Sequence, residues 1–275
     1  MESYQAWKSS GIREKEAYRP HPYKVRESTI LANVPCLLPP VTPTEEGIDT
    51  TDFEKGLSTL QIETVDQCLA AFRYYGGFFL ADGPGVGKGR TIAGIIARTH
   101  RQSTSGCRAL WVSPQASLRA DASRDLGALL PGWEVIDDKM TPQREPERKP
   151  PRAEVAFVTY ASLRYRDRKL LTSLQRWLEE SQAQPVIVFD EAHCVTNTRS
   201  LTFAACHELQ TSIPSARVVY SSATMANDVG HMAILERVGL FGRMGHFDSH
   251  EAFVKAIHPH GSAGLELVAV DLKQR

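Results

Sequence analysis

Glycines alternate around a lysine in one short stretch of this sequence, FFLADGPGVGKGRTIAGII (residues 78–96). Glycine lets a chain curl until backbone N–H groups point inward, and a helix that follows adds positive potential. Lys88 at this place would reach the β- and γ-phosphates of a nucleotide. The stretch is therefore predicted to bind nucleotide phosphates through its loop. Its four glycines are Gly83, Gly85, Gly87 and Gly89.

The loop departs from the usual phosphate-loop pattern G-x-x-x-x-G-K-[ST] at two places. Asp82 stands at the first glycine, and Gly89 stands where Ser or Thr normally follows the lysine. Thr91 is the nearest hydroxyl downstream and a candidate metal contact. A dinucleotide-binding G-x-G-x-x-G frame does not fit, because Lys88 and Arg90 occupy its third-glycine positions. A glycine-rich turn without a ligand is the remaining alternative.

Two adjacent carboxylates follow another apolar run, in PVIVFDEAHC. Asp190 and Glu191 would repel each other unless a bound cation or proton offsets the repulsion between their charges. In a nucleotide site Asp190 would hold Mg²⁺ through water, and Glu191 would orient and deprotonate the attacking water. A DEAH tetrapeptide alone occurs by chance, but here it follows a core strand about 100 residues after a phosphate loop. The pair therefore strengthens the prediction of an ATP site.

Two further segments carry weaker signals. Ser222, Ala223 and Thr224 end the apolar run of VVYSSATMAND, and small hydroxyl residues commonly end strands and begin turns. Gln61 precedes the first predicted strand and could hydrogen-bond an adenine edge. Considered alone, Gln61 is interpreted as a surface residue of a helix.

The elements that must position these residues alternate between strand and helix. A helix is predicted over residues 51–75, with Gly76-Gly77 ending it. Short, nearly continuous apolar strands alternating with helices indicate an α/β fold with a parallel sheet covered on both faces, and ligands of such sheets bind at the carboxyl ends of the strands. The polar segments fall at those ends. The predicted strands are 77–81, 109–113, 154–160, 185–190 and 216–224, and the clearest predicted helices between them are 90–100 and 115–130.

Three further segments lie outside the predicted sheet: an N-terminal arm, a basic loop and a C-terminal helix. Residues 1–50 are proline-rich and are predicted to form an extended arm over the core. Basic residues gather over 144–169, where a solvated loop and helix face is favoured over an edge that contacts nucleic acid. The segment FDSHEAFVKAI predicts a helix with Asp248 as N-cap and Glu251 completing a capping box.

The composition is that of an ordinary globular protein. Of 275 residues, 42% are hydrophobic and 23% charged, and the net charge of zero means that any nucleic-acid surface must be a local patch. Five scattered cysteines indicate reduced side chains in a cytoplasmic or nuclear protein. We find neither a membrane-length apolar run nor a signal peptide, and short loops favour a bacterial or phage source over an animal one.

The order of Gln61, Lys88, DEAH at Asp190–His193 and SAT at Ser222–Thr224 resembles the first RecA-like domain of a superfamily-two helicase. The segments ADGPGVGKGRTIAGII, FVTYASL, VIVFDEAH and ARVVYSSAT together resemble the strawberry notch family, from about residue 21 to the end of the chain. That family characteristically has a phosphate loop reading GVGKGR. Gly89 therefore looks like a family trait.

The resemblance implies further roles for individual residues. ATP would be bound with Mg²⁺, Gln61 would contact adenine, and His193 with Ser222–Thr224 would couple nucleotide state to a nucleic-acid track. Three residues are implied as contacts with the strand backbone, and a purely structural role is at least as well supported for each. These three are Arg119, Thr159 and Ser162. The residues implied to bind ATP are Gln61, Gly83, Gly85, Val86, Gly87, Lys88, Gly89, Arg90 and Thr91.

The resemblance also implies a partner for the ATP site. A superfamily-two motor needs a second RecA-like domain with arginine fingers, and about 50 residues after Thr224 are too few for one. We divide the chain into an arm (1–50), a RecA-like domain (51–226) and an extension (227–275), and expect the second domain in another chain or a missing part. The predicted function is ATP hydrolysis driving a helicase or translocase. The alternative is a nucleotide-dependent regulatory module without motor activity.

Overall fold

The structure is a computed structural model. It describes residues 56–83, 85–133, 135–137, 155–164, 168–179, 182–225, 228–242 and 245–274. The predicted arm over 1–50 and most of the charged loop before residue 155 lie outside the described residues.

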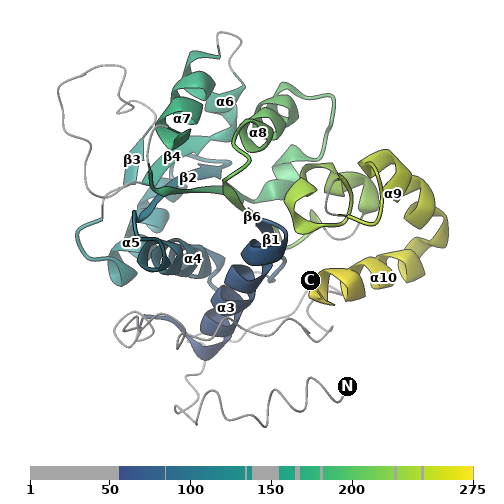
Figure 1. Ribbon diagram of the computed structural model, residues 1–275, viewed down its shortest axis with the longest axis horizontal. Helices are drawn as coiled ribbons and strands as arrows, with labels where there is room; N and C mark the ends of the chain where they lie inside the picture. Colours follow the sequence, from purple (N-terminus) through teal and green to yellow (C-terminus); the bar gives the residue numbers. More distant parts are fainter. Residues whose placement is uncertain are drawn as a thin grey trace.

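A six-stranded sheet forms the centre of the protein (Figure 1), and its strand order is β1-β6-β5-β2-β4-β3. All paired strands run parallel, so the predicted parallel sheet is confirmed. Sequence patterns did not predict β3, a three-residue strand at the edge. The strands are β1 Gly77–Leu80, β2 Cys107–Ser113, β3 Val135–Asp137, β4 Val155–Thr159, β5 Gln184–Asp190 and β6 Arg217–Ser221.

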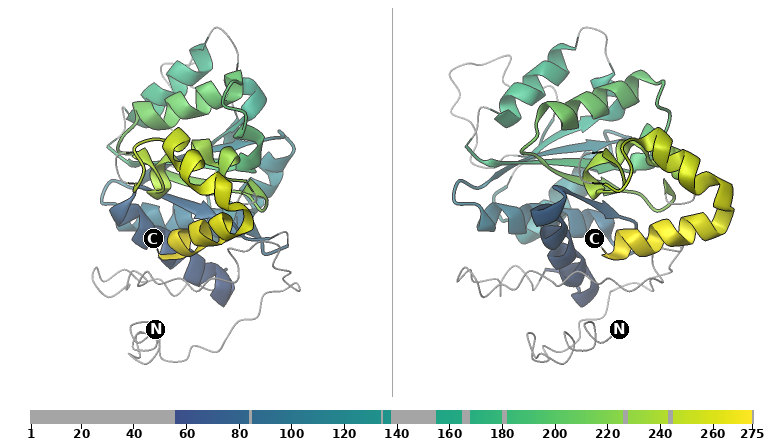
Figure 2. Two further views of the ribbon diagram at one scale, coloured as in Figure 1. Left: turned by 90° about the vertical axis from the view of Figure 1, so that its right-hand side faces the viewer. Right: turned by 45° about the vertical axis from the view of Figure 1, so that its right-hand side comes forward.

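Helices cover both faces of this sheet (Figure 2). One face carries α3 Thr59–Tyr74, α4 Lys88–Gln102 and α5 Leu118–Leu129. The other carries α6 Tyr160–Leu163, α7 Lys169–Glu179 and α8 Leu201–Ser212. The C-terminal elements lie toward the β1 edge in Figure 1. Beyond β5 and β6 the elements are η4 Ala192–Val195, η6 Val229–Ile234, η7 Glu236–Val238, α9 His250–Ile257, η9 His258–His260 and α10 Gly261–Gln274.

Alternate residues of each central strand enter different cores. In β2, Trp111 packs with α3, α4 and α5, whereas Leu110 and Val112 pack with α7 and α8. In β5, Val188 lies in the same core as Trp111, and Phe189 lies in the same core as Leu110 and Val112. Because side chains of a strand point to opposite faces with a period of two, a sheet buried on both faces needs apolar residues at every position. The continuous apolar runs of the sequence therefore follow from the two helical layers.

Two predicted helix starts are wrong, and in both cases a serine hydroxyl sets the boundary. Helix α3 begins at Thr59 because Ser58 caps it and forms a capping box with Gln61. Helix α9 is capped by Ser249, whose side chain accepts the N–H of Ala252, and not by Asp248. The capping box predicted for Asp248 with Glu251 therefore does not form.

The segment after residue 228 shares the core of the sheet. Arg237 donates hydrogen bonds to the carbonyl oxygens of Gln210, Ile213 and Pro214, at the end of α8. The Tyr220 hydroxyl lies 2.5 Å from Gln210 Oε1, and Gln210 Nε2 donates to the Ile234 carbonyl oxygen at 3.0 Å. These hydrogen bonds satisfy groups that would be costly to bury unpaired, and they fix η6 and η7 against β6 and α8.

Among the described residues, no helix combines the length and the apolar character needed to cross a membrane.

Gly77→Ala is expected to destabilise the domain, because a Cβ at residue 77 would lie 2.5 Å from the Arg237 Cβ and 2.7 Å from its carbonyl oxygen. Forcing η7 away from β1 should lower the free energy of unfolding by about 1–3 kcal/mol. Urea unfolding followed by far-UV circular dichroism measures this. Gly127→Ala is the control: a Cβ there meets nothing within 4 Å, and alanine should raise stability by up to about 1 kcal/mol. Equal stability of the two variants would contradict the packing described here.

Candidate nucleotide site

Three polar segments meet at the carboxyl edge of the sheet because their strands are neighbours. Ser221 of β6 is in register with Leu80 of β1 on one side and with Asp190 of β5 on the other. The glycine loop follows Leu80, and the segment 222–224 follows Ser221. Segments far apart in the sequence are therefore brought to adjacent strand ends, the place where ligands of such sheets bind.

Two of the four loop glycines adopt a backbone that other residues rarely take. Gly85 has φ 88° and Gly87 has φ 82°, both in the left-handed region. Gly87 is also the residue before α4, which begins at Lys88. The predicted order of strand, glycine loop, lysine and helix is therefore present.

The Lys88 amino group lies across the loop. It donates to the carbonyl oxygens of Asp82 at 3.2 Å and Gly83 at 3.5 Å. These are neutral acceptors, and an anionic phosphate oxygen would be a stronger partner for an ammonium group. The lysine is thus placed where a phosphate could replace its present contacts.

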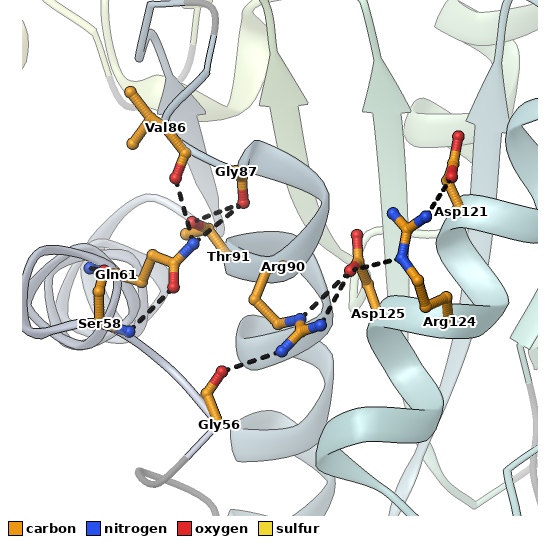
Figure 3. Close-up of polar contacts among 10 residues, drawn as sticks. All are labelled: Gly56, Ser58, Gln61, Val86, Gly87, Arg90, Thr91, Asp121, Arg124 and Asp125. Carbon is orange, nitrogen blue, oxygen red and sulfur yellow. Dashed lines mark hydrogen bonds and ion pairs between the residues drawn. The ribbon is translucent and has the colours of Figure 1, made fainter. Parts of the chain in front are cut away.

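Gln61 is buried, so its interpretation as a surface residue is wrong. Its Nε2 donates to the carbonyl oxygens of Val86 at 3.1 Å and Gly87 at 3.3 Å, and its Oε1 accepts the Ser58 N–H at 3.0 Å (Figure 3). One carboxamide therefore joins the start of α3 to the glycine loop. The S-x-x-Q spacing of Ser58 and Gln61 is the sequence signal for the capping contact, but it does not predict the contact of Gln61 with the loop.

Arg90 extends from α4 toward α5 and the chain before α3. Its Nε and Nη2 each lie 3.2 Å from Asp125 Oδ1, and its Nη1 donates to the Gly56 carbonyl oxygen at 3.0 Å (Figure 3). Binding a phosphate with this guanidinium would require it to leave these partners. Sequence reasoning missed Asp125, although it is a charged residue beside the buried positions Ala122 and Leu126 of α5.

Asp125 gives a physical reason for the glycine after Lys88. A Cβ at residue 89 would lie 2.6 Å from Asp125 Oδ2, closer than van der Waals contact allows. A serine or threonine there would push away the carboxylate that Arg90 holds. The nearest downstream hydroxyl, on Thr91, is buried and donates to the Gly87 carbonyl oxygen at 3.5 Å.

Asp190 and Glu191 follow β5 in different environments. Burial raises the pKa of the Asp190 carboxyl, and a hydrogen bond from the Ser113 hydroxyl to Oδ2, at 3.0 Å, opposes that rise. Glu191 has φ 49° and ψ 52°, a left-handed conformation that costs a non-glycine residue on the order of 1–3 kcal/mol. Such strain is found at sites where the direction of a side chain matters.

His193 links the carboxylates to the segment after β6. Its Nδ1 lies 3.2 Å from Glu191 Oε2 and 3.3 Å from the Ser222 hydroxyl oxygen. That hydroxyl in turn accepts the N–H groups of Thr224 and Met225, each at 3.3 Å. The predicted coupling residues are therefore in one chain of contacts, with Ala223 half-buried between them.

The carboxylates fit a magnesium–nucleotide complex better than a metal cage built by the protein. Within the described part of the chain, no three His, Cys, Asp or Glu side chains are grouped to hold a metal ion. Magnesium is usually bound by one or two carboxylates together with substrate phosphates. A cation beside Asp190 would also offset the burial that disfavours its charged form.

The predicted strand-contact residues lie at the end of β4 and in the helices that follow β2 and β4. Ser113 is in register with Thr159, so the two segments that follow start side by side. Thr159 Oγ1 accepts the Ser162 N–H at 3.1 Å, and the two hydroxyls lie 2.8 Å apart, which gives both residues a role in capping α6. Arg119 is exposed on the first turn of α5.

Comparison with known proteins identifies the family. The model of the family described as P-loop containing NTP hydrolase pore-1 matches residues 20–275. Protein strawberry notch homolog 2 of Mus musculus is 34% identical over 276 residues, covering 92% of this chain and 19% of that protein. Protein FORGETTER 1 of Arabidopsis thaliana is 34% identical over 277 residues, covering 93% of this chain and 21% of that protein.

The resemblance to strawberry notch proteins is thus confirmed over most of the chain. The chain spans about a fifth of the length of these relatives. They come from an animal and a plant, and a bacterial or phage source finds no support among them.

A solved structure shares the fold. The SWI2/SNF2 ATPase core of Sulfolobus solfataricus, solved in complex with double-stranded DNA, matches with a TM-score of 0.56 and 20% identity. The match covers 77% of this chain and 42% of that one. The RecA-like architecture predicted for the domain is therefore confirmed.

Gly89→Ser would restore the usual hydroxyl after Lys88 but is expected to lower the stability of the folded protein. The new side chain would displace Asp125 from Arg90, and we expect a loss of about 1–3 kcal/mol in the free energy of unfolding. Asp125→Ala removes the opposing carboxylate, so Gly89→Ser should cost much less in that background. Urea unfolding of both single variants and the double variant gives the interaction energy. Additive effects would show that Gly89 and Asp125 are not a matched pair.

Proposed function

The chain belongs to the P-loop containing NTP hydrolase pore-1 family, and from this premise we propose that it is the ATP-hydrolysing part of a strawberry notch-type motor acting on nucleic acid. The observation that carries the proposal is the meeting of Lys88, Asp190–Glu191 and Ser222–Thr224 at adjacent strand ends. A site for phosphate, metal and attacking water needs these groups on one edge.

In this proposal each group has a separate task. The segment Gly85–Lys88 binds the β- and γ-phosphates, Asp190 holds Mg²⁺ through water, and Glu191 takes the proton of the attacking water. Mg²⁺ would polarise the γ-phosphate oxygens when bound. His193, in contact with both Glu191 and Ser222, would report the nucleotide state to the segment after β6.

Adenine recognition by Gln61 would use its oxygen. The Gln61 Nε2 is engaged with two loop carbonyls, whereas Oε1 accepts one hydrogen bond and has a second lone pair. Oε1 could therefore accept from an exocyclic amino group of the base. The same side chain would then register both the base and the loop that holds the phosphates.

Hydrolysis in this proposal is completed by an arginine from another domain or chain. Charge develops on the γ-phosphate oxygens during transfer, and an arginine supplied from outside typically contributes ~10³–10⁵ in rate. Arg90, the arginine next to the loop, is engaged with Asp125 and Gly56. The isolated chain should therefore bind ATP while turning it over slowly.

The nucleic-acid track is proposed along the ends of β2 and β4. Arg119, Thr159 and Ser162 would contact the strand backbone there, beside the end of β5. Backbone contacts position a strand without reading its sequence, which suits a motor that moves along it. The DNA bound by the SWI2/SNF2 ATPase core adds support from a protein of the same fold.

Lys88→Ala is expected to weaken nucleotide binding, because it removes the ammonium group placed beside the loop carbonyls. A hydrogen bond to a charged group contributes about 1.5–3 kcal/mol, which corresponds to a roughly 10–100-fold loss of affinity. Titration of a fluorescent ATP analogue with Mg²⁺ measures this. Lys255→Ala, on the exposed side of α9, is the matched control. Equal affinities of all three proteins would overturn the assignment of the phosphate loop.

Glu191→Gln should keep nucleotide binding and remove hydrolysis, since an amide preserves the shape and cannot accept the proton. We expect a fall of about 10²–10⁴-fold in single-turnover ATP hydrolysis by the complete protein in the presence of nucleic acid. Glu251→Gln, exposed on α9, controls for the change of charge. Unchanged hydrolysis by Glu191→Gln would mean that another residue deprotonates the attacking water. If nucleic acid does not change the rate of the native protein, the regulatory module is favoured over the motor.

A further inference from the structure

Asp190 is held by two side chains that come from neither the phosphate loop nor the segment after β6. Ser113, the last residue of β2, donates its hydroxyl to Asp190 Oδ2 at 3.0 Å. Tyr160, the first residue of α6, donates its hydroxyl to the Asp190 carbonyl oxygen at 2.8 Å. One contact fixes the carboxylate and the other fixes the backbone, so the residue is constrained at two points.

Both donors are built into the core. Ser113 has no exposed surface and Tyr160 is 5% exposed, so neither hydroxyl can exchange freely for water. The Tyr160 hydroxyl is a hydrogen-bond donor, and the Asp190 carbonyl oxygen is its acceptor at 2.8 Å. A hydrogen bond between buried groups in this setting orients its acceptor more firmly than a contact at the surface.

The same two residues lie in the segments on the proposed nucleic-acid track. Ser113 precedes the segment that ends at Arg119, and it is in register with Thr159. Tyr160 lies between Thr159 and Ser162, whose hydroxyls contact each other. A strand backbone bound at Thr159 would therefore contact the covalent neighbour of Tyr160, and one bound at Arg119 would contact the segment that begins at Ser113.

We propose that Ser113 and Tyr160 are positioning residues that hold Asp190 in its Mg²⁺-binding orientation and link it to nucleic-acid binding. This inference rests on the proposed function, in which Asp190 serves the metal. Partners that hydrogen-bond a metal-binding carboxylate orient it, and their loss typically costs 10–100-fold in metal affinity. If strand binding favours the same arrangement of Asp190, nucleotide and strand must raise each other's affinity by one factor.

Ser221 provides a matched control for Ser113. It is also a fully buried serine at a strand end, and it is in register with Asp190 on the neighbouring strand β6. Its hydroxyl has no hydrogen-bond partner in the part of the chain that the structure describes. Removing it should therefore change packing as Ser113→Ala does, without removing a contact to Asp190.

The first measurement is a Mg²⁺ titration of fluorescent ATP-analogue binding by the 275-residue chain. Ser113→Ala should raise the Mg²⁺ concentration for half-maximal binding about tenfold, with Mg²⁺-free binding unchanged. Ser113→Thr, which keeps the hydroxyl, should return toward the native value, and Ser221→Ala should equal it. Thermal unfolding of each variant identifies any protein that is not folded.

The second measurement is nucleotide affinity with and without a single-stranded oligonucleotide. Tyr160→Phe keeps the buried ring and removes only the donor, so nucleotide should still bind while the factor by which the oligonucleotide raises its affinity falls toward one. Tyr75→Phe, a half-buried tyrosine at the end of α3, controls for the loss of a tyrosine hydroxyl at another place. The effect of nucleotide on oligonucleotide affinity should fall by the same factor in Tyr160→Phe.

The outcomes separate this inference from the function on which it rests. A native chain that binds no nucleotide would refute the proposed function itself. A native chain that binds nucleotide with Mg²⁺, but whose Ser113→Ala variant needs no more Mg²⁺ than Ser221→Ala, would overturn the positioning role. A native chain that binds both ligands, and whose folded Tyr160→Phe variant keeps the full coupling factor, would overturn the link to nucleic acid.

Discussion

Burial of both faces of the parallel sheet is the constraint from which the rest of this structure follows. Apolar residues occupy both sides of the central strands, so helices must cover both faces. Polar chemistry is then confined to the strand ends, and only the carboxyl edge presents loops that lead into helix starts. The phosphate loop, the carboxylates after β5 and the segment after β6 share this edge because β1, β6 and β5 are neighbours.

Charged groups at a half-buried edge need defined partners. Lys88 uses loop carbonyls, Arg90 uses Asp125 and Gly56, and the Asp190 carboxylate uses Ser113. Each partner comes from a different element, which ties the edge to the helical layers beneath it. An unpaired charge at the same depth would cost more than a hydrogen bond contributes, so these contacts fix the geometry as well as the stability.

The unusual glycine after Lys88 illustrates how packing and chemistry are connected. The Asp125 carboxylate approaches α4 so closely that a side chain at residue 89 would have to displace it. The loop lacks the hydroxyl found in most phosphate loops. In the proposed function, Asp190 and the nucleotide itself would therefore be the main groups that hold the metal. The two hydrogen bonds that Asp190 accepts, one at its carboxylate and one at its backbone carbonyl, are consistent with that proposed role.

The sequence by itself determined the local features: five of the six strands, the glycine loop before a helix, and the carboxylates at a strand end. Apolar runs and glycine conformations act between near neighbours, so these features can be read from the chain. The tertiary structure decided which groups meet: Gln61 with the loop, Asp125 with Gly89 and Arg90, and Ser113 with Asp190. These contacts join residues 25 to 77 positions apart, and only helix packing and strand order set their distances.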